Sequence, residues 1–435
     1  MTDPRRLLDE APMTAPQIVA IGLCVLLNAL DGFDVLAISF ASPGIAAEWG
    51  IDLAALGVVL SMELIGMAVG SVALGAVADR AGRRPTILGC LIVMALGMAA
   101  TTQVAGVGAL LVVRFVTGLG IGGMLACTNA MVAELANARR RSLAVAIMAA
   151  GYPLGAVVGG AIASMLLASH GWRSVFALGA GMTAVCLPLA LWLLPESIGF
   201  LVQRRRADAL ARVNAVLARM RHARVEALPV ATGTGGVPVA ELFTPVLART
   251  TILLTIAYFA QLMTFYFMLK WIPKIVVDMG FSAARAGGVL VWANIGGLAG
   301  GVAFGLATVK AGVRPLMAVS LLASAAMVAV FGRGYGDLAT LALVAGITGF
   351  CTNACMVGLY ALVAQGFPAA VRGGGTGFVI GLGRGGAALG PIAAGAMFQA
   401  GWSLQAVAVA MAAGSLVAFA ALLMLPRSGE QRVRG

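Results

Sequence analysis

The sequence predicts an all-α membrane protein, with twelve transmembrane helices arranged as two parallel six-helix pseudo-repeats. Three observations favour this fold class. Of the 435 residues, 61% are hydrophobic and 11% are charged, whereas soluble domains are about 45–50% apolar and about 25% charged. Apolar runs long enough to cross a bilayer recur along the chain. Segments of the two halves also match each other at a fixed offset.

The apolar runs give the order of the predicted spans, each of which needs about 20 residues. They cover residues 17–40, 54–78, 86–105, 108–132, 143–168, 174–194, 250–272, 287–309, 315–332, 338–364, 374–398 and 403–425. If the N-terminus is cytoplasmic, 22 of the 29 Lys and Arg residues lie in cytoplasmic segments, four in outer loops and three within spans. Cytoplasmic loops carry an excess of Lys and Arg, so we expect a multi-pass inner-membrane protein with both termini in the cytoplasm.

The longest interruption of the apolar runs predicts the domain organisation. The expected parts are a cytoplasmic tail (1–16), a six-helix bundle (17–194), a cytoplasmic linker (195–249), a second six-helix bundle (250–425) and a second tail (426–435). The linker contains the basic stretch RRRADALARVNAVLARMRHARVEAL and the flexible stretch ATGTGG. A basic amphipathic helix can lie against anionic headgroups, so we expect the bilayer, and no nucleic acid, as its partner.

The two predicted bundles share a repeated motif. GAVADRAGRRP (75–85) matches GLATVKAGVRP (305–315) at an offset of 230 residues. The same offset places Gly151, Gly155 and Gly160 over Gly381, Gly385 and Gly390. Parallel six-helix repeats are typical of secondary transporters that work by alternating access, with the substrate site between the repeats.

Several motifs resemble those of a known family. GAVADRAGRRP is similar to the signature loop between spans two and three of the major facilitator superfamily, RFVTGLGIGG (114–123) to its span-four motif, and LPESIGFLVQRRR to its end of span six. DGFD, NAMVAEL…RRR, FYFMLKWIP and RGGGTGFVIGLGRGGAALGP resemble the aromatic acid:proton symporters within that superfamily. The resemblance extends from about residue 17 to residue 425. It implies the major facilitator fold and import of a small aromatic carboxylate, such as 4-hydroxybenzoate, together with protons.

Two acids within the first span are the main candidates for proton coupling. Asp31 and Asp34 lie one helical turn apart on one face. Two carboxylates this close in a low dielectric disfavour double ionisation, so one of them can gain and lose a proton near neutral pH. A structural role as partners of an intramembrane arginine is the alternative. Glu134, at the end of span four, is a third coupling candidate, or else a solvated charge at a helix end.

The candidate substrate-binding residues combine intramembrane arginines with polar and aromatic side chains. Arg384 is flanked by glycines, and its planar guanidinium suits a carboxylate, although a permanent ion pair with an aspartate is the alternative. Arg114 can bind substrate or pair with the span-one acids. Asn129 can donate hydrogen bonds, and Tyr266 and Trp292 can stack on a ring or simply pack between helices.

The motif loop carries the expected cytoplasmic gate. By resemblance to the superfamily, its members are Gly75, Asp79, Arg80, Gly82, Arg83 and Arg84. Gly75 is expected to let helices approach closely, and Asp79 to pair with a helix end or an arginine. Val309 replaces Asp79 in the second half, so the gate is expected to be asymmetric.

The sequence also excludes some classes of function. It has no catalytic constellation, no nucleotide-binding GxxxxGK[ST] motif and no cluster of metal-ligating residues, so we expect no enzyme, no metal site and no cofactor. The proton gradient is the expected energy source, a small organic anion the expected substrate, and a monomer the expected state. Two alternatives stay open: symport of a non-aromatic acid (muconate, quinate or dicarboxylate type), and proton-driven export of drugs or metabolites. Lys270 departs from the family pattern within FYFMLKWIP, where a small polar residue is expected before Trp-Ile-Pro, and Glu63 fits no family motif. Neither residue has an assigned role.

Overall fold

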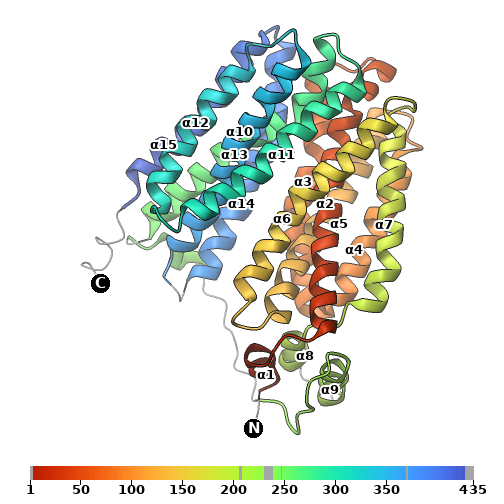
Figure 1. Cartoon of the computed structure of the whole chain (residues 1–435), viewed down its shortest axis with the longest axis vertical. Helices are drawn as coiled ribbons and strands as arrows, with labels where there is room; N and C mark the ends of the chain where they lie inside the picture. The colour runs from red at the N-terminus through yellow and green to blue at the C-terminus, as the bar shows by residue number, and fades with distance from the viewer. Residues whose placement is uncertain (1–2, 205–207, 230–238, 246, 369–370, 427–435) are drawn as a thin grey trace. The chain divides into compact units, whose positions relative to one another are not determined.

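A computed structural model of the protein describes residues 3–204, 208–229, 239–245, 247–368 and 371–426. Every regular element in these ranges is a helix (Figure 1). Twelve long helices are α2 (Ala15–Trp49), α3 (Leu53–Ala81), α4 (Arg83–Thr101), α5 (Val107–Leu135), α6 (Arg141–Leu166), α7 (Arg173–Leu193), α10 (Ala248–Asp278), α11 (Ala283–Ala307), α12 (Val313–Phe331), α13 (Leu338–Gln365), α14 (Arg372–Gln399) and α15 (Leu404–Met424). The short ones are α1 (Pro4–Glu10), α8 (Ile198–Arg204), α9 (Ala209–Arg219) and the 3-10 helix η1 (Val239–Phe243).

The predicted fold class is confirmed. Among the described residues, twelve helices are long and apolar enough to cross a membrane. Several of these helices extend beyond the predicted spans. A helix can continue past the end of an apolar run until a residue with a non-helical backbone conformation ends it. For example, α2 continues to Trp49 and α10 to Asp278, and each is followed closely by a glycine at positive φ, Gly50 (59°) and Gly280 (96°). Glycine adopts this left-handed conformation without a steric cost, which makes it a common helix terminator.

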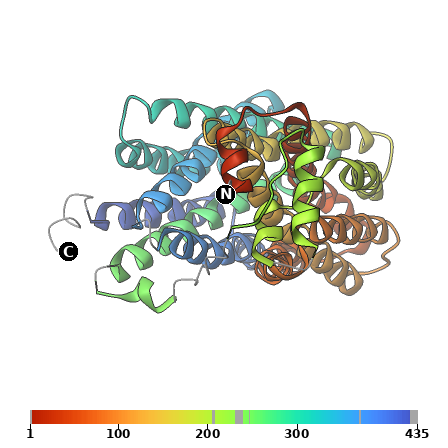
Figure 2. The ribbon, with the colours of Figure 1, turned by 90° about the horizontal axis from the view of Figure 1, so that it is seen from below.

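The short helices lie outside the transmembrane spans. The predicted basic linker forms α8 and α9, and Val213 and Leu217 of α9 are buried. Figures 1 and 2 show both helices beyond the ends of the long helices of the first bundle. The N-terminal tail contains α1, a helix that is not predicted from the sequence. The side chain of Asp3 caps it by accepting a hydrogen bond from the N–H of Arg5. The stretch ATGTGG and the tail from residue 427 onward lie outside the described residues.

The chain divides into two compact units. Unit 1 comprises Met1–Val35, Ile65–Gly159 and Arg173–Thr234. Its helices approach closely through glycines: a Cβ on Gly155 of α6 would lie 1.7 Å from the main-chain oxygen of Ala29 in α2. Close approach of this kind lets small residues hold transmembrane helices together. It fixes the segment of α2 that carries Asp31 and Asp34.

Unit 2 comprises Leu36–Leu64, Gly160–Trp172 and Gly235–Gly435. It therefore contains α10 to α15 together with the end of α2, the start of α3 and the end of α6. Its long helices pack mainly as the pairs α11 with α13, α10 with α14 and α15, and α12 with α13 and α15. In the pair of α10 and α14, a Cβ on Gly386 would lie 2.0 Å from the main-chain oxygen of Phe259. This contact positions the segment of α14 that carries Arg384.

Candidate functional site

The two acids of the first span lie in the interior of unit 1. Asp31 is 1% exposed and Asp34 is fully buried. Gly32 between them packs directly on α6, because a Cβ there would lie 1.9 Å from the main-chain oxygen of Tyr152. The Asp31 carboxylate is near enough to Cys90 of α4, and the Asp34 carboxylate to Cys186 of α7, to interact electrostatically. The acids are thus enclosed by α4, α6 and α7.

Arg114 of α5 joins this group. It is fully buried, and its Nη2 donates to the main-chain oxygen of Asp34 at 3.3 Å. Its guanidinium carbon lies 5.2 Å from the centroid of the Phe176 ring in α7, which is within the range of a cation–π contact. The structure therefore brings Arg114 beside the acid pair. We call Asp31, Asp34 and Arg114 the acid–arginine cluster.

Arg384 lies in unit 2, on α14, near Tyr258, which in turn interacts with two further tyrosines. The hydroxyl of Tyr258 on α10 interacts electrostatically with Arg384 and with Tyr266, and it also hydrogen-bonds with Tyr360 of α13. The rings of Tyr258 and Tyr360 meet edge to face, with centroids 5.7 Å apart. Arg384 itself is half-buried, and its Nη1 atom is buried with no hydrogen-bond partner among the described residues. We call Arg384 and these tyrosines the arginine–tyrosine cluster.

The glycines around Arg384 have two different roles. Gly383 and Gly386 pack against α10, since a Cβ on Gly383 would lie 2.3 Å from Cδ1 of Tyr258. A Cβ on Gly381, one turn before Arg384, would meet no atom within 4 Å. The space that the sequence suggests around the guanidinium is therefore present on one side only, and helix packing fills the other.

The structure does not bring two other predicted substrate-binding residues into either cluster. Trp292 of α11 is 55% exposed. Asn129 of α5 is also exposed, and its amide nitrogen donates to the main-chain oxygen of Leu125 one turn earlier, at 2.9 Å. Tyr360, in contrast, is absent from the sequence-based prediction, and Tyr258 is there only one of several aromatic residues of the seventh span that could face a cavity. The chain has five tyrosines among 435 residues. A tyrosine within an apolar span is therefore uncommon, and this rarity is the sequence signal that could have identified both residues.

Glu134 belongs to a polar network at the ends of α4 and α5. Its carboxylate forms an ion pair with Arg83 and accepts a hydrogen bond from the Ser197 hydroxyl. The neighbouring Glu196 accepts from the main-chain N–H groups of Arg83 and Arg84, at 2.9 and 3.2 Å. A carboxylate in this position stabilises the N-terminus of a helix. Glu134 is therefore anchored by specific partners. Glu196 is a residue that the sequence analysis missed, although it lies in the quoted motif LPESIGFLVQRRR.

The gate motif supplies the backbone geometry of this network. Gly82 has φ of 112°, a conformation that strongly favours glycine, and a Cβ there would lie 2.5 Å from Oε2 of Glu196. Asp79 and Arg80 are exposed, and the main-chain oxygen of Asp79 accepts a hydrogen bond from Nε of Arg204 at 3.4 Å. A Cβ on Gly75 would meet no atom within 4 Å. The close helix approach expected at Gly75 is thus not present in this structure.

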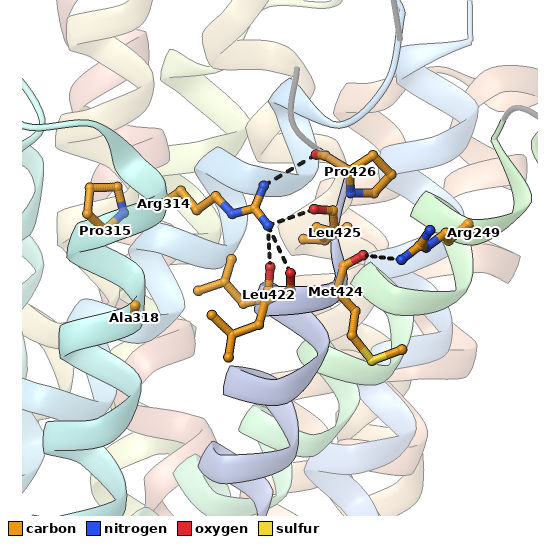
Figure 3. Close-up of a pocket in the computed structure, with 9 residues that line it drawn as sticks. Arg249, Arg314, Pro315, Ala318, Leu422, Met424, Leu425 and Pro426 are labelled. Atoms are coloured by element: carbon orange, nitrogen blue, oxygen red, sulfur yellow. Dashed lines mark hydrogen bonds between the residues drawn. The ribbon is translucent and has the colours of Figure 1, made fainter. Parts of the chain in front are cut away.

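The arginine of the repeated motif has the same role in both halves. Arg84 donates to the main-chain oxygen of Leu191, near the end of α7, at 2.6 Å. Arg314, at the matching position, donates to main-chain oxygens at the end of α15: Leu422 at 3.0 Å, Leu423 at 3.2 Å, Leu425 at 2.6 Å and Pro426 at 3.4 Å (Figure 3). A cation is favourable at a helix C-terminus. The motif therefore caps the last long helix of each repeat.

Among the described residues, no group of three or more His, Cys, Asp or Glu side chains could hold a metal ion. All six cysteines are free. His222 follows α9, where burial lowers its pKa, and its Nε2 lies 3.0 Å from Oε1 of Gln17.

Comparison with known proteins identifies the family. The model of the Major Facilitator Superfamily matches residues 24–308 and 254–435. The chain is 31% identical to the 4-hydroxybenzoate transporter PcaK of Pseudomonas putida, over 94% of this chain and 92% of the relative. It is 30% identical to a gallate transporter of Pseudomonas putida, over 98% and 95% of the two chains. It is also 29% identical to the 3-(3-hydroxy-phenyl)propionate transporter of Escherichia coli K12, over 94% of each chain.

Solved structures support the same fold. The inward-open xylose transporter XylE of E. coli superposes with a TM-score of 0.73 at 18% identity, over 95% of this chain and 98% of that chain. A D-xylose-proton symporter superposes with a TM-score of 0.71 at 17% identity, over 94% and 97% of the chains. The matched family and the named relatives are transporters and not enzymes. The chain is a multi-pass membrane protein and belongs to the Major Facilitator Superfamily.

Proposed function

We propose that this transporter imports a small aromatic carboxylate of the hydroxybenzoate type, together with protons, by alternating access. The observation that carries the proposal is the acid–arginine cluster. Two carboxylic acids and one arginine, each 1% exposed or less, share the interior of unit 1. Charged groups inside a membrane protein are costly and rarely kept without a function. The named relatives, which transport aromatic acids, supply the substrate class.

In the proposed mechanism, protonation of Asp31 or Asp34 is the coupling step. Arg114 supplies a fixed positive charge beside the pair, so the net charge of the cluster changes by one when an acid takes up a proton. A proton that enters with a monoanionic substrate makes the transported complex neutral overall. The transmembrane proton gradient then drives accumulation of the acid without any cofactor.

The arginine–tyrosine cluster is the proposed substrate site. The guanidinium of Arg384 can bind a carboxylate through two parallel hydrogen bonds. Tyr258 lies near Arg384, and Tyr266 and Tyr360, which interact with Tyr258, add further hydroxyl groups and rings to the cluster. Stacking of an aromatic substrate on such rings contributes about 0.5–1.5 kcal/mol per pair, and the hydroxyls can recognise a ring substituent.

The proposed setting is the inner membrane, with both termini in the cytoplasm, because 22 of 29 Lys and Arg residues then lie on the cytoplasmic side. The proposed working unit is a monomer. In this orientation Glu134, Arg83 and Glu196 lie at the cytoplasmic ends of α4 and α5, where the gate motif is expected to act.

The proposal is tested with purified full-length protein in proteoliposomes. Uptake of radiolabelled benzoate, 4-hydroxybenzoate, gallate, muconate and quinate is measured with and without a pH gradient that is acidic outside. We expect gradient-dependent uptake of a hydroxybenzoate. Uptake of muconate or quinate alone would instead support a non-aromatic substrate. Gradient-driven efflux of unrelated compounds, with no uptake of any acid, would show an exporter.

A further inference from the structure

Glu63 and Lys270, which the sequence leaves without a role, face each other in unit 2. Lys270 Nζ on α10 lies 3.9 Å from Oε2 of Glu63 on α3, and both side chains are fully buried. Lys and Glu are almost never fully buried unless they are paired. The residues come from different repeats, since α3 belongs to the first six-helix half and α10 to the second. The ion pair thus joins the two repeats.

Further contacts join both α3 and α10 to α14. A Cβ on Gly57 of α3 would lie 2.6 Å from the main-chain oxygen of Pro391 and 3.3 Å from Cα of Gly395, both on α14. At the first residue of α3, the N–H of Leu53 donates to Oε1 of Gln399 at 3.1 Å. Trp271, next to Lys270, donates from Nε1 to the oxygen of Pro391 at 3.1 Å. We call these contacts between α3, α10 and α14 the seam.

The seam and the ion pair respond differently to water. The Gly57 and Gly395 contact depends only on shape, and separating it exposes apolar surface. Separating Glu63 from Lys270 exposes two charges, which regain their hydration. For a buried ion pair, the attraction and the cost of dehydration nearly cancel, whereas removing one partner leaves a buried charge uncompensated. The intact pair therefore permits both closing and opening, while a single charge in the seam opposes closing.

We propose that the Glu63–Lys270 ion pair is a latch that specifies the closed state of the seam and separates each time the transporter opens at this end. This inference rests on the proposed alternating access. In the proposed orientation, the connection between α2 and α3 is extracellular, so the latch closes the outer end. Its contribution is to the balance between conformations, and the substrate does not contact it.

The latch is tested by the accessibility of one engineered cysteine. Leu56 is fully buried in the first turn of α3, about 10 Å along the helix from Glu63 at 1.5 Å per residue. The variant Leu56→Cys is labelled with a membrane-impermeant maleimide in proteoliposomes, without substrate or gradient. The same protein without this cysteine gives the background from the six native cysteines. Three further proteins carry Leu56→Cys together with Glu63→Gln, with Lys270→Gln, or with the charge swap Glu63→Lys and Lys270→Glu.

We expect each single substitution to increase the labelling rate at least about tenfold, because an uncompensated buried charge disfavours the closed seam. The charge swap restores a pair and should return the rate to that of the parent. Asp278→Asn, which removes the partner of Lys274 at the exposed end of α10, is the matched control and should leave the rate unchanged.

Two results would overturn the latch. One is a parental labelling rate in both single variants, and the other is a swap variant that is labelled as fast as the singles. Each variant is checked for a monodisperse peak by size-exclusion chromatography, and either single variant suffices if the other misfolds. The labelling experiment needs no substrate, so it tests the latch independently of the substrate. If the proposed function is wrong, the parent protein will show no uptake of aromatic acids, whatever the labelling rates are.

Discussion

Arg114 and Asp34 are bound through the backbone, with the guanidinium of Arg114 donating to the main-chain oxygen of Asp34 at 3.3 Å inside unit 1. The residues are 80 positions apart in the chain, on α5 and α2. This bond links α5 to α2 and holds the arginine beside Asp34. The positive charge of Arg114 is therefore placed next to one of the two acids of the proposed coupling step.

Removal of that charge should stop transport. Arg114→Gln leaves two buried acids without their neighbouring cation, and we expect gradient-driven uptake to fall at least about a hundredfold, given that an uncompensated buried charge costs about 3–5 kcal/mol. Arg114→Lys keeps the charge but loses the planar fork, so partial activity is expected. Uptake is normalised to the amount of protein in the membrane. Arg285→Gln, at the exposed start of α11, is the control and should transport normally.

Arg384 should determine substrate affinity. In Arg384→Lys the positive charge stays, but two parallel hydrogen bonds to a carboxylate are no longer possible. A hydrogen bond to a charged group contributes about 1.5–3 kcal/mol, so KM should rise roughly ten- to a hundredfold. Arg372→Lys changes an exposed arginine on the same helix and should leave KM unchanged. An unchanged KM in Arg384→Lys would exclude a role for this guanidinium in binding the carboxylate.

Glu196 should stabilise the N-terminus of α4. Substitution Glu196→Ala removes the acceptor for the N–H groups of Arg83 and Arg84, and loss of such a cap costs about 0.5–2 kcal/mol. We expect a lower Tm in detergent, with Glu196→Gln intermediate because the amide oxygen still accepts hydrogen bonds. Glu241→Ala, on the exposed η1 helix, should not change the Tm. Equal Tm values for Glu196→Ala and the parent would contradict the capping role.

The repeated arginines should stabilise the ends of α7 and α15 to different extents. Arg314 donates to four main-chain oxygens and Arg84 to one, so Arg314→Ala should lower the Tm more than Arg84→Ala does. Thermal unfolding followed by the fluorescence of a thiol-reactive dye measures both, since the native cysteines are mostly buried. The reverse order would show that the number of carbonyl contacts does not determine the stability of these helix ends.

Much of the fold could be predicted from the sequence, because a helix that crosses the bilayer needs a long apolar run. Such a run can be recognised without knowing which residues meet in the folded protein. The number of spans and the repeat at an offset of 230 residues are examples. The helix ends were less predictable. For α2 and α10 they depend on the glycines at positive φ, Gly50 and Gly280, rather than on hydropathy.

The candidate site was predictable where a charged residue stands alone in an apolar run, as Asp31, Asp34, Arg114 and Arg384 do. What the sequence could not provide is which of these side chains meet. The pairing of Glu134 with Arg83 joins the end of α5 to the start of α4, and that of Glu63 with Lys270 joins helices far apart in the chain. Tyr258 and Tyr360 likewise become neighbours only when α10 packs beside α13.

The central claim is that protonation of the acid pair couples the proton gradient to transport. The most direct test compares two activities of Asp34→Asn in proteoliposomes: uptake driven by a pH gradient, and exchange of labelled for unlabelled substrate at equal pH. An asparagine resembles a permanently protonated aspartate. The variant can therefore still move bound substrate across the membrane, but position 34 can no longer take up or release a proton. We predict that driven uptake is lost and exchange is retained. Driven uptake at the rate of the parent, in both Asp34→Asn and Asp31→Asn, would contradict it.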